Sequence, residues 1–162
     1  MRIFGIDPGS TVTGFGVIEK RRGRVHLIDG GCIRTHSKQP FTERLLAIHQ
    51  GLVDAIQRNQ PDEVAIESIF RYKSSESALR LGQARGVALL AIAQGGFTAH
   101  EYNPTTIKRT IGAHGKADKK AVAKMVEMLL GTKITGPADV SDALAIAICH
   151  AHHNRSLVGG RT

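Results

Sequence analysis

The sequence predicts an α/β fold in which helices flank a mixed, five-stranded sheet. Three apolar segments at the start are joined only by short turns, and later apolar segments alternate with helical patterns. Strands joined by tight turns form an antiparallel meander, whereas strand–helix alternation favours parallel neighbours. No internal repeat or linker divides the 162 residues, so we expect one domain.

The strands are delimited by apolar runs and by turn residues. The first strand ends at Asp7, the basic stretch 21–24 forms the turn between the second and third strands, and the fourth strand ends at Glu67. The five expected strands cover residues 2–7, 13–19, 25–33, 64–67 and 98–102.

The helices follow from apolar residues at helical spacing. Pro61 stops the first helix, and Gly95-Gly96 closes the second. The expected helices cover residues 42–58, 75–94, 104–111, 117–130 and 139–153. We therefore expect a folded domain over residues 1–153 and a flexible C-terminal tail over residues 154–162.

The charge balance indicates a polyanionic partner. Lys and Arg number 22 against 14 Asp and Glu, a net charge of +8. Such an excess neutralises phosphates and releases counterions, although general solubility also accounts for it. No segment approaches the ~20 apolar residues of a membrane span, and the start MRIFGID is unlike a signal peptide. We expect a cytoplasmic protein without a membrane partner.

Four carboxylates occupy positions at which the predicted elements can converge. Asp7 and Glu67 end the first and fourth strands, which can be sheet neighbours, and Asp139 and Asp142 share one face of the last helix's first turn. Carboxylates this close stay ionised only beside a cation, and oxygen ligands suit Mg²⁺ or Mn²⁺. Two such ions ~4 Å apart support phosphodiester hydrolysis.

Each acid also has a purely structural interpretation. Asp7 can accept backbone hydrogen bonds in an Asp-Pro-Gly turn, and Asp139 can cap its helix. Asp142 can interact favourably with the dipole at the start of that helix. The stretch 7–14, DPGSTVTG, is also similar to the first phosphate loop of the sugar-kinase and actin superfamily. That alternative requires two related domains and a second phosphate loop, which one domain does not supply. Together the four acids favour the metal site.

The second helix carries small residues four apart, at Ala78, Gly82 and Gly86, and is apolar on every side from Gly86 to Ala93. A helix that is apolar all round is buried all round. We interpret this stripe as a two-fold homodimer interface. The alternative is that another helix of the same chain covers it.

Two basic groups are candidates for DNA contacts. Phe70 lies three residues after Glu67, next to Arg71 and close to Lys73. An exposed aromatic there can stack on an unpaired base while the two cations bind phosphates. The alternative is that Phe70 is a core residue. The second group is Lys108, Arg109, Lys116, Lys119, Lys120 and Lys124, of which Lys108, Lys116, Lys119 and Lys120 are the candidate DNA contacts. Lysines at a helix start oppose its dipole, so phosphate contact explains them better. The pair Cys149 and His153 is only a weak zinc signature.

Five segments resemble the RuvC family of bacterial Holliday junction resolvases (crossover junction endodeoxyribonucleases). They are GIDPGSTVTGFGVI, GCIRT, AIESIF, SALRLGQARGVAL and DVSDALAIAICH, in family order between residues 3 and 153. The resemblance implies a ribonuclease H-like fold of the retroviral integrase superfamily. It also implies paired, symmetric, Mg²⁺-dependent nicks in four-way junction DNA that leave 5′-phosphates, as part of recombination and repair.

The resemblance further implies site residues and partners. It makes Asp7, Glu67, Asp139 and Asp142 the catalytic, metal-binding tetrad, with two Mg²⁺ ions for which Mn²⁺ can substitute, and places Phe70 at a stacking position. It implies a homodimer through the small-residue helix and a helicase complex of the RuvA and RuvB type as partner. A junction-binding scaffold that no longer cuts and a monomeric ribonuclease H are the alternatives.

Overall fold

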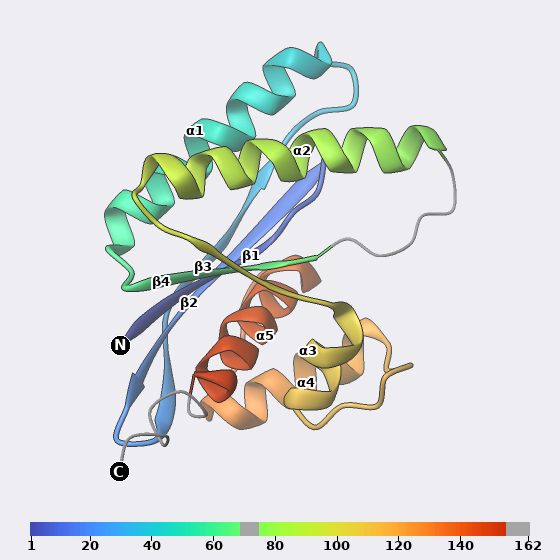
Figure 1. Cartoon of the computed structure of the whole chain (residues 1–162). Helices are drawn as coiled ribbons and strands as arrows, with labels where there is room; N and C mark the ends of the chain where they lie inside the picture. The colour runs from blue at the N-terminus through green and yellow to red at the C-terminus, as the bar shows by residue number, and fades with distance from the viewer. Residues whose placement is uncertain (69–74, 155–162) are drawn as a thin grey trace.

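The protein is an α/β domain, seen in a computed structural model that describes residues 1–68 and 75–154 (Figure 1). The strands are β1 (Arg2–Asp7), β2 (Val12–Arg21), β3 (Arg24–Arg34), β4 (Glu63–Glu67) and β5 (Ala99–Tyr102). The helices are α1 (Phe41–Asn59), α2 (Ser75–Gln94), α3 (Pro104–Thr110), α4 (Lys119–Leu130) and α5 (Ala138–His153). The predicted α/β fold is confirmed, and each predicted boundary lies within two residues of the observed one.

The strands form one mixed sheet in the order β3-β2-β1-β4-β5. β1, β2 and β3 form the predicted antiparallel meander, while β4 runs parallel to both β1 and β5. Ile6 of β1 pairs with Ile66 of β4. The last residues of these two central strands therefore lie side by side at one end of the sheet, as the sequence predicts.

Side-chain alternation along the central strands separates two cores. Phe4 and Ile6 of β1 pack with α1 and α2 on one face of the sheet. Ile3 of β1 and Ala65 of β4 pack with α5 on the other face, where α3 and α4 cover α5 (Figure 1). Residues 3, 5 and 7 of β1 and residues 63, 65 and 67 of β4 thus point toward α5.

Only one side of α2 is covered within the described part of the chain. Its buried residues, Ala84, Ala88, Ala91 and Ile92, belong to the core shared with α1. Ala78 is half-buried, but Gly82 and Gly86 are exposed. Apart from the neighbouring residues and the helix's own backbone, none of the described atoms lies within 4 Å of a Cβ built at either glycine.

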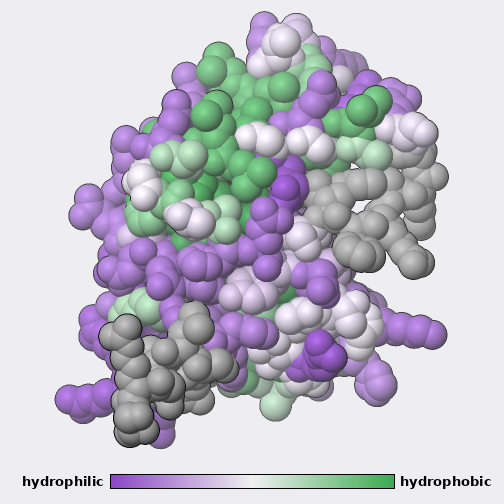
Figure 2. All heavy atoms as spheres, in the orientation of Figure 1, coloured by the Kyte–Doolittle hydropathy of each residue, from purple (hydrophilic) through white to green (hydrophobic). Residues whose placement is uncertain are grey.

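Large apolar side chains flank this open side. Leu79 and Leu90 of α2 are 68% and 52% exposed, and Leu46 of α1 is 54% exposed. Figure 2 shows apolar surface gathered over the half of the molecule where these two helices lie. Among the described residues, coverage by another helix therefore accounts for one side of α2 and not for the glycine side.

The ends of the described chain meet near the start of β4. Asn154, the first residue of the predicted tail, donates a hydrogen bond from its side chain to Glu63 (2.6 Å). Residues 155–162 lie outside the described residues. Over the described ranges, no helix is both long and apolar enough to cross a membrane.

Candidate active site

Asp7 and Glu67 mark the end of the sheet where the candidate site lies. They are the last residues of β1 and β4, and the residues just before them, Ile6 and Ile66, pair with each other. Both acids occupy strand positions on the face that α5 covers. Asp139 and Asp142 come from the first turns of α5, the helix that packs on this face. The topology therefore brings all four predicted acids to the same end of the sheet.

Three glycines let α5 approach the sheet closely. A Cβ at Gly5 would lie 2.2 Å from the Ala143 carbonyl oxygen, and one at Gly14 would lie 2.2 Å from that of Asp139. A Cβ at Gly16 would meet the Leu144 side chain at 2.6 Å. Because Gly14 pairs with Asp7 across the β1–β2 ladder, it sets the separation between Asp7 and the backbone of Asp139.

This seating role of the glycines was absent from our sequence analysis. The available signal was the spacing of Gly14 and Gly16, which are two apart in a strand and therefore share a face. Glycine inside a strand often marks the close approach of another backbone.

The loop after Asp7 is held by side chains of β2, of α1 and of the residue that follows β3. The Thr13 hydroxyl donates to the Gly9 carbonyl (2.7 Å), and the Thr35 hydroxyl donates to the Ser10 carbonyl (2.7 Å). Arg44 of α1, only 3% exposed, also donates to the Ser10 carbonyl (2.8 Å) and to the Thr35 hydroxyl (3.2 Å). These contacts fix the loop beside Asp7. Arg44 is a positioning residue that our sequence analysis did not identify.

Three of the four acids line one pocket of ≈ 250 Å³. Asp7, Glu67 and Asp142 are on its wall with the cations of Lys108 and Lys119. Apolar side chains, among them Ile107, complete the lining. Asp139 instead lines a neighbouring groove formed by the loop that follows Asp7. Three members of the predicted tetrad thus line the pocket, and the fourth lines the neighbouring groove.

The carboxylates in the pocket are poorly suited to being ionised together. Burial raises the pKa of Asp7 well above its ordinary value, and the neighbouring charges, first that of Glu67, raise it further. Burial followed by the charge of Asp142 raises the pKa of Glu67. Burial also raises the pKa of Asp142, although Lys119 acts in the opposite direction. Carboxylates that cannot all be ionised without a compensating positive charge fit a binding site for a hard divalent cation.

The acids do not form a closed ligand cluster. Among the residues that the structure describes, no group of three tetrad members has its oxygens gathered as ligands of one ion. Lys119 lies 3.5 Å from Asp142 in an ion pair. Partial burial lowers the pKa of Lys119, but the charges of Asp142, Asp139 and Asp7 together raise it above its ordinary value.

The predicted basic residues occupy α3, α4 and the loop between them. Lys108 of α3 is half-buried in the pocket, and α3 begins where the Asn103 side chain accepts from the Thr106 amide (2.8 Å). Lys116, Lys119 and Lys120 are exposed. They lie around the start of α4, whose Asp118 cap accepts from the Ala121 amide (2.8 Å).

The other predicted DNA-binding group follows Glu67 in the sequence. Phe70, Arg71 and Lys73 lie outside the described residues, between β4 and α2. Their position relative to the pocket stays a prediction.

The weak zinc signature at the end of α5 contains contacts that need no metal. His153 Nδ1 lies 2.9 Å from the Cys149 carbonyl oxygen and 3.7 Å from the Cys149 sulfur. His150, one turn before the helix end, instead faces β4 and β5 and is only 3% exposed.

Comparison with known proteins identifies the family. Residues 3–150 match the family described as crossover junction endodeoxyribonuclease RuvC. A protein of that name from Chloroflexus aurantiacus is 47% identical over 153 residues, which are 94% of this chain and 93% of the relative. One from Pelotomaculum thermopropionicum is 46% identical over 154 residues, 94% of each chain.

Solved structures agree with this assignment. The structure described as "T. thermophilus RuvC in complex with Holliday junction substrate" superposes with a TM-score of 0.86. It is 34% identical and covers 96% of each chain. The yeast mitochondrial Holliday junction resolvase Ydc2 shares the fold, with a TM-score of 0.71. It is 13% identical, and the match covers 98% of this chain and 81% of Ydc2. The ribonuclease H-like α/β architecture and the sequence match together place this chain in the crossover junction endodeoxyribonuclease RuvC family.

Proposed function

We propose that this protein resolves Holliday junctions by hydrolysing one phosphodiester bond in each of two opposed strands. The observation that carries the proposal is the pocket lined by Asp7, Glu67 and Asp142 together with Lys108 and Lys119. Its acidic side chains fit divalent cations, and its lysines fit the phosphates of DNA. The related T. thermophilus protein is described in complex with a Holliday junction, which supports the same substrate class here.

Membership of this nuclease family implies a divalent metal. We assign it to Asp7, Glu67, Asp139 and Asp142, with two Mg²⁺ ions per site and Mn²⁺ as a substitute. When bound, such ions supply an activated water and stabilise the leaving 3′ oxygen. The raised pKa values of Asp7, Glu67 and Asp142 support this assignment, because a cation would allow these groups to be ionised together.

The chain's own cations would orient the substrate. Lys108, half-buried in the pocket, is suited to a phosphate close to the cleaved bond. The exposed Lys116, Lys119 and Lys120 extend this positive surface outward from the pocket. Lys119 also forms an ion pair with Asp142, which partly offsets the charge of that carboxylate.

Paired nicks require two active sites, and we infer a homodimer through the open side of α2. Exposed Leu79 and Leu90 flank Gly82 and Gly86, where a second helix backbone can approach closely. A two-fold axis through this helix would present two equivalent pockets to a four-way junction. The resemblance to the family adds a RuvA and RuvB type helicase complex as an expected partner, and the cytoplasm as the expected location.

The decisive experiment uses a synthetic four-way junction with the wild-type chain and the Asp7→Asn variant, each with and without Mg²⁺. We expect both proteins to bind the junction and only the wild type with Mg²⁺ to produce paired, symmetric nicks. Equal cleavage by the variant would refute the role of Asp7. Binding by both proteins without cleavage would favour a junction scaffold, and cleavage of an RNA–DNA hybrid instead would favour a ribonuclease H.

A further inference from the structure

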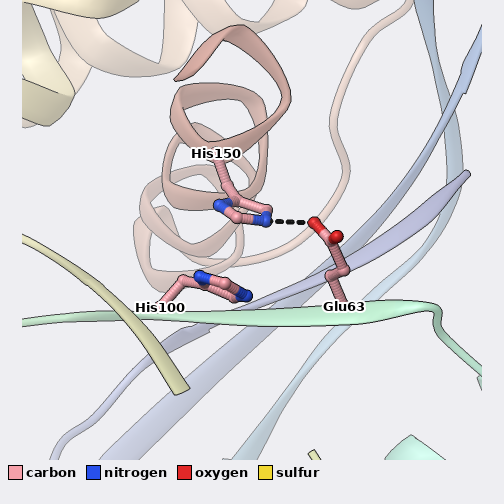
Figure 3. Close-up of side chains that lie close together, drawn as sticks. All are labelled: Glu63, His100 and His150. Atoms are coloured by element: carbon pink, nitrogen blue, oxygen red, sulfur yellow. Dashed lines mark hydrogen bonds and ion pairs between the residues drawn. The ribbon is translucent and has the colours of Figure 1, made fainter. Parts of the chain in front are cut away.

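A second group of metal-binding side chains lies at the opposite end of β4 from the active site. Glu63 is the first residue of β4, His100 belongs to β5, and His150 belongs to α5; their nitrogen and carboxylate oxygen atoms lie within 4.8 Å of one another. Figure 3 shows the three side chains converging from these three elements. Glu63 precedes Glu67 by four residues, or about 13 Å of strand, so this group is separate from the tetrad.

The fold brings these three residues to the same face of the sheet. His100 pairs with Ala65, and Glu63 lies two residues before Ala65 on the same face of β4, which is the face covered by α5. His150 is 3% exposed, and its ring lies 4.3 Å from that of His100, centroid to centroid. A long-range fold contact, not a sequence motif, therefore assembles the group.

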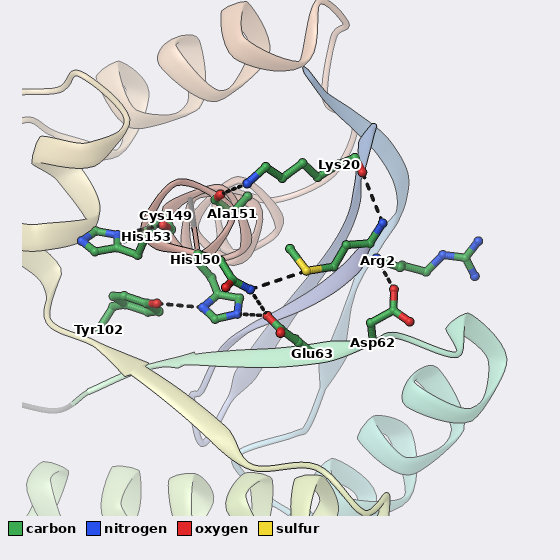
Figure 4. A network of polar contacts seen from close by, with 11 residues as sticks. Arg2, Lys20, Asp62, Glu63, Tyr102, Cys149, His150, Ala151 and His153 are labelled. Carbon is green, nitrogen blue, oxygen red and sulfur yellow. Dashed lines mark hydrogen bonds and ion pairs between the residues drawn. The ribbon is translucent and has the colours of Figure 1, made fainter. Parts of the chain in front are cut away.

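Both ring nitrogens of His150 have defined partners. Nε2 lies 2.5 Å from a Glu63 carboxylate oxygen, and Nδ1 lies 2.7 Å from the Tyr102 hydroxyl (Figure 4). A histidine that ligates a metal through Nε2 is usually oriented by a hydrogen bond from its other ring nitrogen. The Tyr102 oxygen is placed to accept that bond from Nδ1–H. Burial lowers the pKa of His150, which favours the neutral imidazole that ligands require.

From this arrangement we propose that Glu63, His100 and His150 form a Zn²⁺ site that ties α5 to β4 and β5. Two imidazoles and one carboxylate are a known zinc donor set, with a water molecule at the fourth position. Zinc bonds of about 2.0–2.2 Å place tetrahedral ligand atoms ~3.3 Å apart, so the Glu63–His150 contact would open and His100 would move inward. His100 can do so because it lies on β5, the edge strand of the sheet.

Metal binding needs no net proton release from His150. In the metal-free arrangement, Nε2–H can donate to Glu63 while Nδ1 accepts from Tyr102. On zinc binding, Nε2 gives its lone pair to the ion, the ring proton is carried on Nδ1, and the Tyr102 oxygen accepts it. The Tyr102→Phe variant therefore loses only the orienting hydrogen bond, whereas His100→Ala loses a ligand.

The test titrates the metal-stripped full-length protein with Zn²⁺ against a chromophoric chelator, in excess Mg²⁺ to occupy the tetrad. We expect one equivalent of Zn²⁺ to bind, and Co²⁺ in its place to give the intense visible absorption of tetrahedral coordination. His100→Ala should weaken binding on the order of 100-fold or more, and Tyr102→Phe about 10–100-fold. Zn²⁺ at 100 times Kd should raise the wild-type Tm by about 5–10 °C.

Matched variants separate this site from the other metal-binding groups. Three control variants should keep wild-type zinc affinity. Asp7→Asn removes a member of the tetrad, Cys149→Ala removes the thiol near His153, and His114→Ala removes an exposed loop histidine. Loss of binding in Asp7→Asn or Cys149→Ala, or full binding in His100→Ala, would overturn the proposal, as would the absence of saturable binding. Glu63→Gln provides a second ligand variant that keeps a hydrogen-bond acceptor for His150, and its circular dichroism checks folding.

Discussion

The Gly14→Ala substitution tests whether α5 must lie directly against the sheet for the active site to form. The added Cβ would lie 2.2 Å from the Asp139 carbonyl oxygen, 2.6 Å from the Asp139 carbonyl carbon and 3.1 Å from the Asp139 Cβ. Ordinary contact begins near 3.4 Å, so the start of α5 must retreat by about 1.2 Å. The atoms in the way are backbone atoms, which cannot rotate aside as a flexible side chain can.

The displacement has separate consequences for activity and for stability. A misplacement of about 1 Å in a catalytic group can cost on the order of 100-fold in rate, because Asp139 would leave its position beside Asp7. Forcing an extra methyl into a packed region costs roughly 1–3 kcal/mol. For a domain of this size, that lowers Tm by about 2–12 °C.

The assays are junction cleavage with Mg²⁺ and thermal unfolding with and without it. Gly115→Ala is a matched stability control, since the nearest atom to its new Cβ, on Thr105, lies 3.8 Å away in ordinary contact. Wild-type cleavage together with an unchanged Tm in Gly14→Ala would refute the close seating of α5. A lowered Tm with wild-type cleavage would mean that the reaction does not depend on the close placement of Asp139.

Three further predictions concern charge and assembly. Removing one buried carboxylate in Asp7→Asn should stabilise the metal-free protein by about 0.5–2 kcal/mol, measured by thermal unfolding in EDTA. The pKa of Asp7 is raised in the folded state, so ionisation of Asp7 destabilises the fold as pH rises above its pKa in the unfolded chain, near ~4. The stability gained in Asp7→Asn should therefore be larger at pH 8 than at pH 5. A gain independent of pH would contradict the burial of a charge. Lys119→Ala should weaken junction binding and reduce the slope of log K against log salt by about 0.9 if Lys119 contacts phosphate, and an unchanged slope would exclude that contact. Gly82→Leu should leave a folded single chain in sedimentation, since its Cβ meets open space in the monomer; an intact dimer would exclude α2 as the interface.

The local elements were largely predictable from the sequence. The bounds of α2 are those expected from its apolar pattern and the Gly95-Gly96 stop, because helix ends depend on neighbouring residues. The adjacency of Asp7 and Glu67 was also predictable, since each ends a buried strand and the two strands are parallel neighbours. The tetrad as a metal site and the α2 dimer stay predictions from the sequence and the family resemblance.

Other features were decided only by contacts between residues far apart in the chain. The sequence shows Gly5, Gly14 and Gly16, but only the packing of α5 shows that their missing side chains make room for its backbone. His150 appeared among other histidines near the chain end; the tertiary structure turns it toward Glu63, 87 residues away, and leaves His153 with Cys149. By itself the sequence determined which segments become strands and helices and which acids end them, because short-range periodicity and turn chemistry are local. Which side chains meet across elements was decided by the tertiary structure, because sheet order and helix seating depend on the packing of the whole core.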